Sequence, residues 1–397
     1  GVATTINVDN TYSVLLIGNS YSEDASNCAP MTFSRLQQML QNAYPDKDVV
    51  VGLCYSGGKT MAWHYDKALK GASAYSLRIA KGDGTWTSAG NMSSAAALSY
   101  MDWDVVSLQP YAKETREGTG YNYSDNDKGE ESYNNSYITY EYTLDESFGY
   151  MLHYVHCYAP SAQTYLYMTW QEVSDNTNLN AGADDYAKIV ENLVTKSERY
   201  YGHYFKDSAG KISDSKAAGA QETKTDEHFA DVIPVGTAVQ NERSTYFALL
   251  AHNVEAISGS VNLTSDPVRG LQRDSGHLSY NIGRYTAALT FAQKLTGKDS
   301  DTLMKNIDVY PGTGLQKFPA DYRAIMAAAV TNAIKQPSQV TPFDAAYAVD
   351  PAVQAKTAVE AASYAYHLSA AADYTEKDLA TRVQTAVDNA VSALKTK

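Results

Sequence analysis

The sequence predicts an α/β protein built around a parallel sheet, and three observations lead to this prediction. Short runs of β-branched residues alternate with longer segments of helical pattern, which is typical of parallel α/β construction. The runs are almost continuously apolar, as expected for strands that helices cover on both faces. The chain has 397 residues, enough for one large domain with an appendage, or for two domains.

The expected elements follow one another along the chain. Five apolar runs predict strands, at SVLLIG (13–18), DVVVGL (48–53), WDVVSL (103–108), TYLYMT (164–169) and DVIPV (231–235). Between and after them, helical patterns occupy residues 30–43, 145–158, 182–201, 237–255, 279–296 and 320–335. The stretch 75–89 predicts a hairpin instead, because Asp83-Gly84 suits a tight turn.

Two segments depart from this alternation. Residues 111–147 are rich in tyrosine, Asn and Asp and are too long and polar for a plain connection, so we expect a functional loop; the alternative is a solvated loop whose tyrosines pack locally. From about residue 340 the composition becomes Ala-rich and predicts two helices. We therefore expect a main domain at 1–339 and a small helical appendage at 340–397 behind the linker KQPSQVTPFD.

Composition excludes several classes of protein. Lys and Arg number 32 against 45 Asp and Glu, and the net charge of −13 makes nucleic acid an unfavourable partner. No apolar run approaches the roughly 18 residues of a membrane span. The three cysteines lie far apart, without a zinc-ribbon or dithiol spacing. The chain starts without Met or a signal peptide, as a mature or trimmed chain does, and its composition resembles bacterial secreted or cell-surface carbohydrate-active proteins.

The stretch LLIGNSYSEDA (15–25) places a serine directly after an apolar strand. Ligands of open parallel sheets bind beyond the carboxyl ends of the strands, so Ser20 lies where reactive groups collect. A helix that starts close by would also direct free N–H groups at a developing oxyanion. Ser20 is therefore a candidate nucleophile, and the alternative is an ordinary helix N-cap serine.

A serine nucleophile needs a base and a group that orients the base. His277 follows Asp274 by three residues in LQRDSGHLSY, a spacing that lets one short loop present the carboxylate to one ring nitrogen. The alternative is a surface Asp and His in a loop. His64, after a glycine pair, is expected to have a structural or substrate-contact role, and no other histidine has a nucleophile-like setting.

Competing motifs are incomplete or absent. SGGKT (56–60) ends like a P-loop, but position 53, which would need glycine, is Leu53. The chain contains no G-x-S-x-G, H-E-x-x-H or G-x-G-x-x-G sequence. This excludes the usual signatures of α/β-hydrolases, zinc peptidases and dinucleotide-binding proteins.

Taken in order, the remaining motifs resemble those of the SGNH, or GDSL-type, hydrolase superfamily. Gly18-Asn19-Ser20 is similar to its first block, with Asn in place of the usual Asp. YSGGKT resembles the second block, with Gly58 in register for the oxyanion glycine, and RDSGHLS matches the D-x-x-H block. The third block departs, because Gln109 stands where the family has Asn. The resemblance covers roughly residues 10–335, and the first block is similar to that of a less characterised bacterial branch with GNSFS-like sequences.

The resemblance implies a three-layer α/β/α, flavodoxin-like domain with a five-stranded parallel sheet and an esterase mechanism. Ser20 would attack an ester carbonyl, His277 would accept its proton, and Asp274 would orient the imidazole. The N–H groups of Ser20 and Gly58 and the amide of Gln109 would form the oxyanion hole. No metal or organic cofactor is implied.

The expected substrate is an acylated carbohydrate, because aromatic and Asn or Asp side chains suit sugar rings. The residues expected to contact substrate are Asn19, Tyr21, His64, Tyr111 and Trp170, although Trp170 could equally be a core residue. Two alternatives remain: a catalytically weak or inactive carbohydrate-binding or surface protein, and a lipid or aryl esterase. The sequence does not indicate an oligomeric state.

Overall fold

The computed structural model describes residues 10–29, 33–111, 144–170, 204–206, 212–214, 229–243, 274, 276–280, 282–307, 320–339, 341, 385, 388 and 392. The chain divides into two compact units. The first comprises Gly1–Thr169 and Asp185–Ile233, and the second comprises Trp170–Asp184 and Pro234–Lys397. The predicted appendage at 340–397 falls almost entirely outside the described residues.

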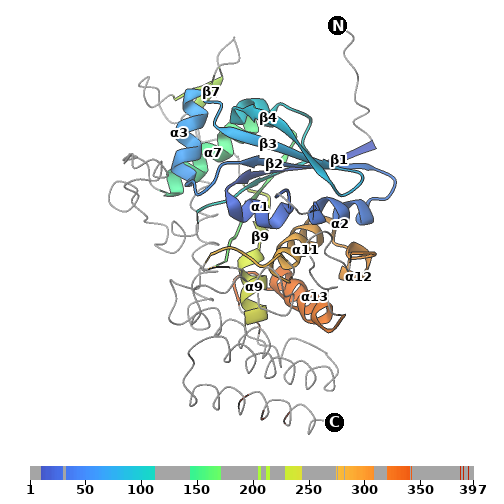
Figure 1. Ribbon diagram of the computed structural model, residues 1–397. Coiled ribbons are helices and arrows are strands. Elements are labelled where there is room, and N and C mark those ends of the chain that lie inside the picture. Colours follow the sequence, from blue (N-terminus) through green and yellow to red (C-terminus); the bar gives the residue numbers. More distant parts are fainter. Residues whose placement is uncertain are drawn as a thin grey trace. The chain divides into compact units, whose positions relative to one another are not determined.

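The first unit contains a seven-stranded sheet with strand order β4-β3-β2-β1-β5-β6-β9. Figure 1 labels β1 to β4 and β9 of this sheet. Its strands are β1 Thr11–Gly18, β2 Asp48–Tyr55, β3 Tyr75–Lys81, β4 Trp86–Met92, β5 Val105–Leu108, β6 Gln163–Tyr167 and β9 Asp231–Ile233. A separate antiparallel pair is formed by β7 (Tyr204–Lys206) and β8 (Ile212–Asp214). The predicted α/β class is confirmed.

The prediction of a five-stranded parallel sheet is wrong in its extent. The five predicted runs do form β1, β2, β5, β6 and β9, which pair in parallel. The predicted hairpin also joins the sheet, because β3 pairs antiparallel with β2 and β4 with β3. Pairing with β3 uses backbone groups that would otherwise leave β2 as an open edge, which gives the hairpin a physical reason to extend the sheet.

Helices cover the central part of the sheet, because the strands β1, β2 and β5 are buried on both faces. Within the first unit these helices are α1 Ser20–Ser26, α2 Arg35–Ala43, α3 Met61–Lys70, α4 Ser94–Leu98 and α7 Leu144–Tyr158. On β1, Leu15 and Ile17 share a core cluster with residues of α3, α4 and α7. Their neighbours Val14 and Leu16 are equally buried and point to the opposite face, where α1 and α2 lie against β1 and β2 (Figure 1).

The second unit contains helices α9 (Val235–Arg243), α11 (Ile282–Thr296), α12 (Ser300–Leu303) and α13 (Ala320–Lys335). The helices α9, α11 and α13 pack against one another. Their interface contains polar side chains with partners: Asn241 donates its amide to the carbonyl of Ala329 at 3.1 Å, and Thr286 donates its hydroxyl to Glu242 Oε1 at 2.6 Å. Small residues such as Ala288 and Ala292 allow these helices to approach closely.

Most predicted helices in the described part are confirmed with shifted ends. Helix α2 begins at Arg35 rather than residue 30, α7 begins one residue earlier than expected, and α11 begins at Ile282 rather than 279. The predicted helix at 182–201 and most of the tyrosine-rich segment 111–147 lie outside the described residues. Among the described helices, none has the length and apolar character that crossing a membrane would require.

Candidate active site

Ser20 lies where β1 passes directly into a helix. It is the first residue of α1, and its N-cap is Asn19, whose carbonyl accepts from the N–H groups of Ser22 and Glu23 at 3.0 and 3.1 Å. The Asn19 side chain accepts from Tyr21 N at 2.9 Å, as a capping residue does. Ser20 itself is therefore not the capping residue, and it is partly exposed whereas Asn19 is buried.

The loop between β2 and α3 lies beside this turn. Ser56 donates its N–H to the carbonyl of Gly18 at 3.0 Å, and the Asn19 amide donates to the carbonyl of Lys59 at 3.4 Å. Between these two contacts lies Gly58, whose φ of +67° is in the left-handed region that glycine adopts readily. The predicted second block is thus brought next to the predicted nucleophile.

Gln109, which follows β5, lies beside the same turn between β1 and α1. Its backbone N–H donates to the carbonyl of Ile17 at 3.1 Å, which continues the pairing of β5 with β1. Its side chain is fully buried and hydrogen-bonds to Asn19 and Ser22, the residues on either side of Ser20 and Tyr21. The three sequence blocks that contain Ser20, Gly58 and Gln109 therefore converge at the carboxyl edge of β1, β2 and β5.

The second unit holds the predicted acid and base in one short loop. His277 Nδ1 lies 2.8 Å from Asp274 Oδ2 and 3.1 Å from Oδ1. The same carboxylate accepts from the backbone N–H groups of Gly276 at 2.9 Å and His277 at 2.6 Å. The predicted pairing of Asp274 with His277 is thus present in the structure.

These contacts determine the charge of Asp274. Partial burial by itself would raise the pKa of this carboxyl group. The hydrogen bonds from the His277 ring and from the N–H groups of His277 and Gly276 outweigh that effect and hold the pKa of Asp274 well below its usual range. Asp274 is therefore an ionised acceptor that orients the ring.

Trp170 supports the loop that contains the acid and the base. Its indole is fully buried, and its Nε1 donates to the carbonyl of Gly276 at 2.6 Å. Gly276 is adjacent to His277 and also donates to Asp274. Of the two roles expected for Trp170, the structure favours the core residue over the substrate contact, because the indole has no exposed surface.

His64 is buried as well. Its Nδ1 lies 2.7 Å from the Tyr75 hydroxyl, and the two rings are stacked with an interplanar angle of 8°. Burial, assisted by the charge of Lys59, lowers the pKa of His64 to about 3, so the ring is neutral at ordinary pH. The side chain has no exposed surface, which favours the structural role over substrate contact.

The other residues expected to contact substrate differ in position. Asn19 and Tyr21 are nearly fully buried, and the carbonyl of Tyr21 accepts from the Tyr167 hydroxyl at 3.1 Å. Tyr111 is partly exposed, two residues beyond Gln109. Asn19 thus organises the turn, and of these three residues Tyr111 has the most accessible position.

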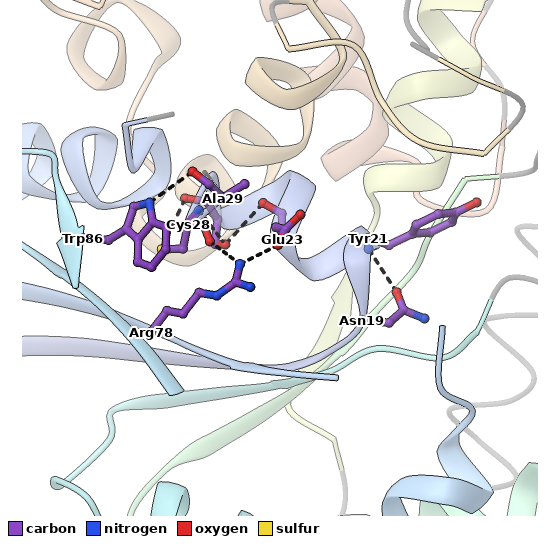
Figure 2. Close-up of polar contacts among 8 residues, drawn as sticks. Asn19, Tyr21, Glu23, Cys28, Ala29, Arg78 and Trp86 are labelled. Carbon is purple, nitrogen blue, oxygen red and sulfur yellow. Dashed lines mark hydrogen bonds and ion pairs between the residues drawn. The ribbon is translucent and has the colours of Figure 1, made fainter. Parts of the chain in front are cut away.

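Sequence reasoning missed a cluster that holds the far end of α1. Figure 2 shows Arg78 of β3 reaching Glu23 of α1 and the carbonyl of Cys28, which it contacts at 2.6 Å. The Arg78 guanidinium lies 4.4 Å from the Tyr55 ring centroid and 5.2 Å from that of Trp86. Trp86 Nε1 in turn donates to the carbonyl of Ala29 at 3.2 Å.

No local pattern links these residues, because Arg78 and Glu23 are 55 positions apart. The available signal was limited to a cation in the middle of the strand YSLRIAK and to two carboxylates, Glu23 and Asp24, in the stretch after Ser20.

Comparison with known proteins supports the fold. Residues 13–197 match the family DUF4886, described as a domain of unknown function. A crystal structure of a DUF4886 family protein from Bacteroides uniformis has a TM-score of 0.51 and 22% identity, over 84% of this chain and 98% of that chain. No curated protein matches the chain. The family match includes Ser20, Gly58 and Gln109 and ends before Asp274 and His277.

Proposed function

We propose that the protein is a serine esterase of SGNH type that removes acetyl or other short acyl groups from a carbohydrate through an acyl-enzyme. Ser20 is the nucleophile, His277 the general base and acid, and Asp274 the residue that orients His277. The protein acts outside the cell or on its surface, where acylated polysaccharides are accessible. No metal or organic cofactor takes part.

The observation that carries this proposal is the geometry of Asp274 and His277. An ionised carboxylate at 2.8 Å from Nδ1 favours the tautomer in which Nδ1 carries the proton. Nε2 is then the basic nitrogen, which is the arrangement a serine nucleophile requires. Two backbone donors further fix the carboxylate, so the imidazole is held by a preorganised partner.

The position of Ser20 is a second support. The strands β2, β1, β5, β6 and β9 are parallel and adjacent in that order, which corresponds to the flavodoxin-like order 2-1-3-4-5. In such sheets the ligand binds beyond the carboxyl ends of the strands, at the point beside the first strand where the strand order reverses. Ser20 follows β1 at this edge with only Asn19 between them, and Gly58 and Gln109 follow the neighbouring strands β2 and β5.

The reaction proceeds in two displacements. Ser20 Oγ attacks the ester carbonyl carbon while His277 Nε2 takes the hydroxyl proton. The backbone N–H groups of Ser20 and Gly58 stabilise the oxyanion of the tetrahedral intermediate. His277 then donates the proton to the departing sugar oxygen, which leaves the acyl group on Ser20. A water molecule attacks this ester while His277 takes one of its protons, and His277 then returns that proton to Ser20 Oγ as the carboxylic acid leaves.

The test compares wild type with Ser20→Ala on a short-chain aryl acetate and on a panel of acetylated glycans. We expect release of acetate from at least one glycan and loss of at least about 10³-fold in kcat for Ser20→Ala. Mass spectrometry after treatment with a fluorophosphonate should locate the adduct on Ser20. Equal activity of the variant and the wild type would refute the proposed nucleophile, and glycan binding without hydrolysis would favour the carbohydrate-binding alternative.

A further inference from the structure

The side chain of Gln109 has all of its amide hydrogens directed at acceptors of the protein. Its Nε2 lies 2.8 Å from Asn19 Oδ1 and 2.7 Å from the carbonyl oxygen of Pro110. A glutamine amide has two N–H donors, so both are used. A donation to an oxyanion would first require one of these buried contacts to break, which carries a desolvation penalty.

The oxygen of the same amide is engaged three times. Gln109 Oε1 accepts from the N–H of Asn19 at 3.0 Å, from the N–H of Ser22 at 3.0 Å and from the Ser22 hydroxyl at 2.8 Å. Asn19 precedes Ser20, and Ser22 follows it by two residues. One buried oxygen therefore holds the backbone on both sides of Ser20.

Gly18 makes this approach possible. A Cβ atom at residue 18 would lie 2.3 Å from Gln109 Oε1 and 2.3 Å from Ser22 Oγ, which is too close for any side chain. The Gln109 side chain, one residue beyond the end of β5, passes beside Gly18 and reaches the start of α1. The glycine, the glutamine and Ser22 thus form one interlocked set.

We propose that Gln109 is a positioning residue, which fixes the turn that bears Ser20 through its contacts with Asn19 and Ser22 and does not donate to the oxyanion. The inference rests on the proposed esterase function for its catalytic consequence. It assigns to Ser22 the role of binding Gln109 Oε1 with its N–H and hydroxyl groups, which neither the motif resemblance nor the position of the nucleophile indicates.

The test combines kinetics with amide hydrogen exchange on the full chain. The variants are Gln109→Met, which keeps the length and removes the hydrogen bonds, and Ser22→Ala, which removes one partner of Oε1. Gln37→Met is the matched control, because Gln37 is also a buried glutamine bonded to a backbone carbonyl, that of Val49, but lies in α2.

We expect Gln109→Met to lower kcat about 100-fold and Ser22→Ala about fivefold, both with little change in KM. The double variant should be within about twofold of Gln109→Met, because the two residues act as one unit. Exchange of the Asn19 and Ser22 amides should accelerate in both variants, whereas exchange within β1 stays slow. Gln37→Met should keep the wild-type kcat, and Gln109→Glu, which retains the acceptor oxygen, should restore part of the protection.

Independent, multiplicative effects of Gln109→Met and Ser22→Ala on kcat would overturn the inference. A lower kcat in Gln109→Met with unchanged exchange of the Asn19 and Ser22 amides would also overturn it, because loss of an oxyanion donor produces that result. An unchanged kcat in Gln109→Met would overturn it as well. If Gln109→Met does not fold, Ser22→Ala decides through the same two measurements. If Ser20→Ala retains full activity, the proposed function fails, while the exchange rates still show whether Gln109 holds the turn.

Discussion

Asp274 keeps its carboxylate ionised because the chain folds three N–H donors onto it. Its pKa is held well below the usual range, so the stabilising contribution of the charged form is present above the unfolded pKa of about 4 and is lost only as the pH falls through the lowered folded value. Asp274 therefore stays charged throughout the pH range in which a histidine titrates. Any loss of activity on mild acidification must arise from another group.

We predict that the acid limb of the kcat/KM profile lies well above the pH at which Asp274 titrates, because the general base is an imidazole and the carboxyl group is already ionised. The profile should be measured with an aryl acetate between pH 4 and 9. An acid limb near pH 4 would indicate that a carboxylate titrates instead, which contradicts the role given to Asp274.

The variant Asp274→Asn should lose about 10³-fold to 10⁴-fold in kcat, because the amide cannot favour the tautomer of His277 that a general base needs. The measurement is aryl acetate hydrolysis under saturating substrate. Asp301→Asn, at an exposed position in α12, is the control and should retain wild-type kcat. A loss of less than tenfold in Asp274→Asn would argue against the triad.

His64 provides a residue-scale prediction about stability. Its folded pKa of about 3 lies below the unfolded value of about 6.5, so between these values the unfolded state binds a proton that the folded state does not. The contribution of His64 to the free energy of unfolding therefore has its full value above the unfolded pKa. Between the two pKa values it decreases as the pH falls, by about 1.4 kcal/mol per pH unit.

His64→Gln does not titrate, and its free energy of unfolding should therefore depend less steeply on pH between 4 and 6 than that of the wild type. Urea denaturation at several pH values measures the two slopes. His156→Gln, a partly exposed histidine on α7, is the control. Parallel curves for wild type and His64→Gln would contradict a neutral buried ring.

At the scale of elements, α1 is too short to be stable alone, and contacts at both ends hold it. A helix of seven residues gains little from its own hydrogen bonds, because nucleation is costly. Asn19 and Gln109 hold its first turn, while Arg78 binds Glu23 and the carbonyl that follows the helix (Figure 2). The orientation of the helix after Ser20 thus depends on three strands.

Arg78→Met should therefore lower the free energy of unfolding by about 2 to 4 kcal/mol, since it removes a largely buried ion pair, a charged hydrogen bond and contacts with two aromatic rings. Chemical denaturation gives the value. Lys81→Met on the same strand is the matched control, because the ion pair of Lys81 with Asp48 is exposed and 3.8 Å long, and its loss should cost at most about 0.5 kcal/mol. A similar loss of unfolding free energy in Arg78→Met and Lys81→Met would contradict the stabilising role of Arg78.

At the scale of the whole molecule, β1 occupies the interior of the sheet and β4 its edge. Strand β1 pairs with β2 and β5 and is buried on both faces, whereas every residue of β4 is partly or fully exposed. We predict that native-state hydrogen exchange of β1 amides occurs only through global unfolding, and that β4 amides exchange through local opening with a lower free energy. Equal protection of the two strands would contradict this order.

Much of this architecture could be predicted from the sequence, because it depends on local signals. The apolar runs identified all five parallel strands, and Asp83-Gly84 identified the hairpin, where Gly84 has a φ of +80°. The D-x-x-H spacing predicted the contact between Asp274 and His277 because both lie in one short loop. These features involve residues close in sequence or periodic along it.

What could not be predicted depends on contacts between distant segments. The sequence gives no means of knowing that Gln109 Oε1 lies within reach of Ser22, 87 positions earlier, or that Arg78 reaches Glu23. The choice between core and cleft for His64 and Trp170 also depends on burial, which the residue types leave open. The extent of the sheet was underestimated because a hairpin pattern does not reveal which edge it joins.

The attachment of the hairpin has a consequence for anyone who redesigns this protein. Residues 75–92 form a hairpin at one edge of the sheet and contain no residue of the proposed triad, so a shortened protein could be designed without them. Arg78 and Trp86 of this hairpin, however, donate hydrogen bonds to the carbonyls of Cys28 and Ala29, which follow the helix that begins with Ser20. A trimmed protein would retain every residue of the proposed triad while losing the support of the helix that the nucleophile begins.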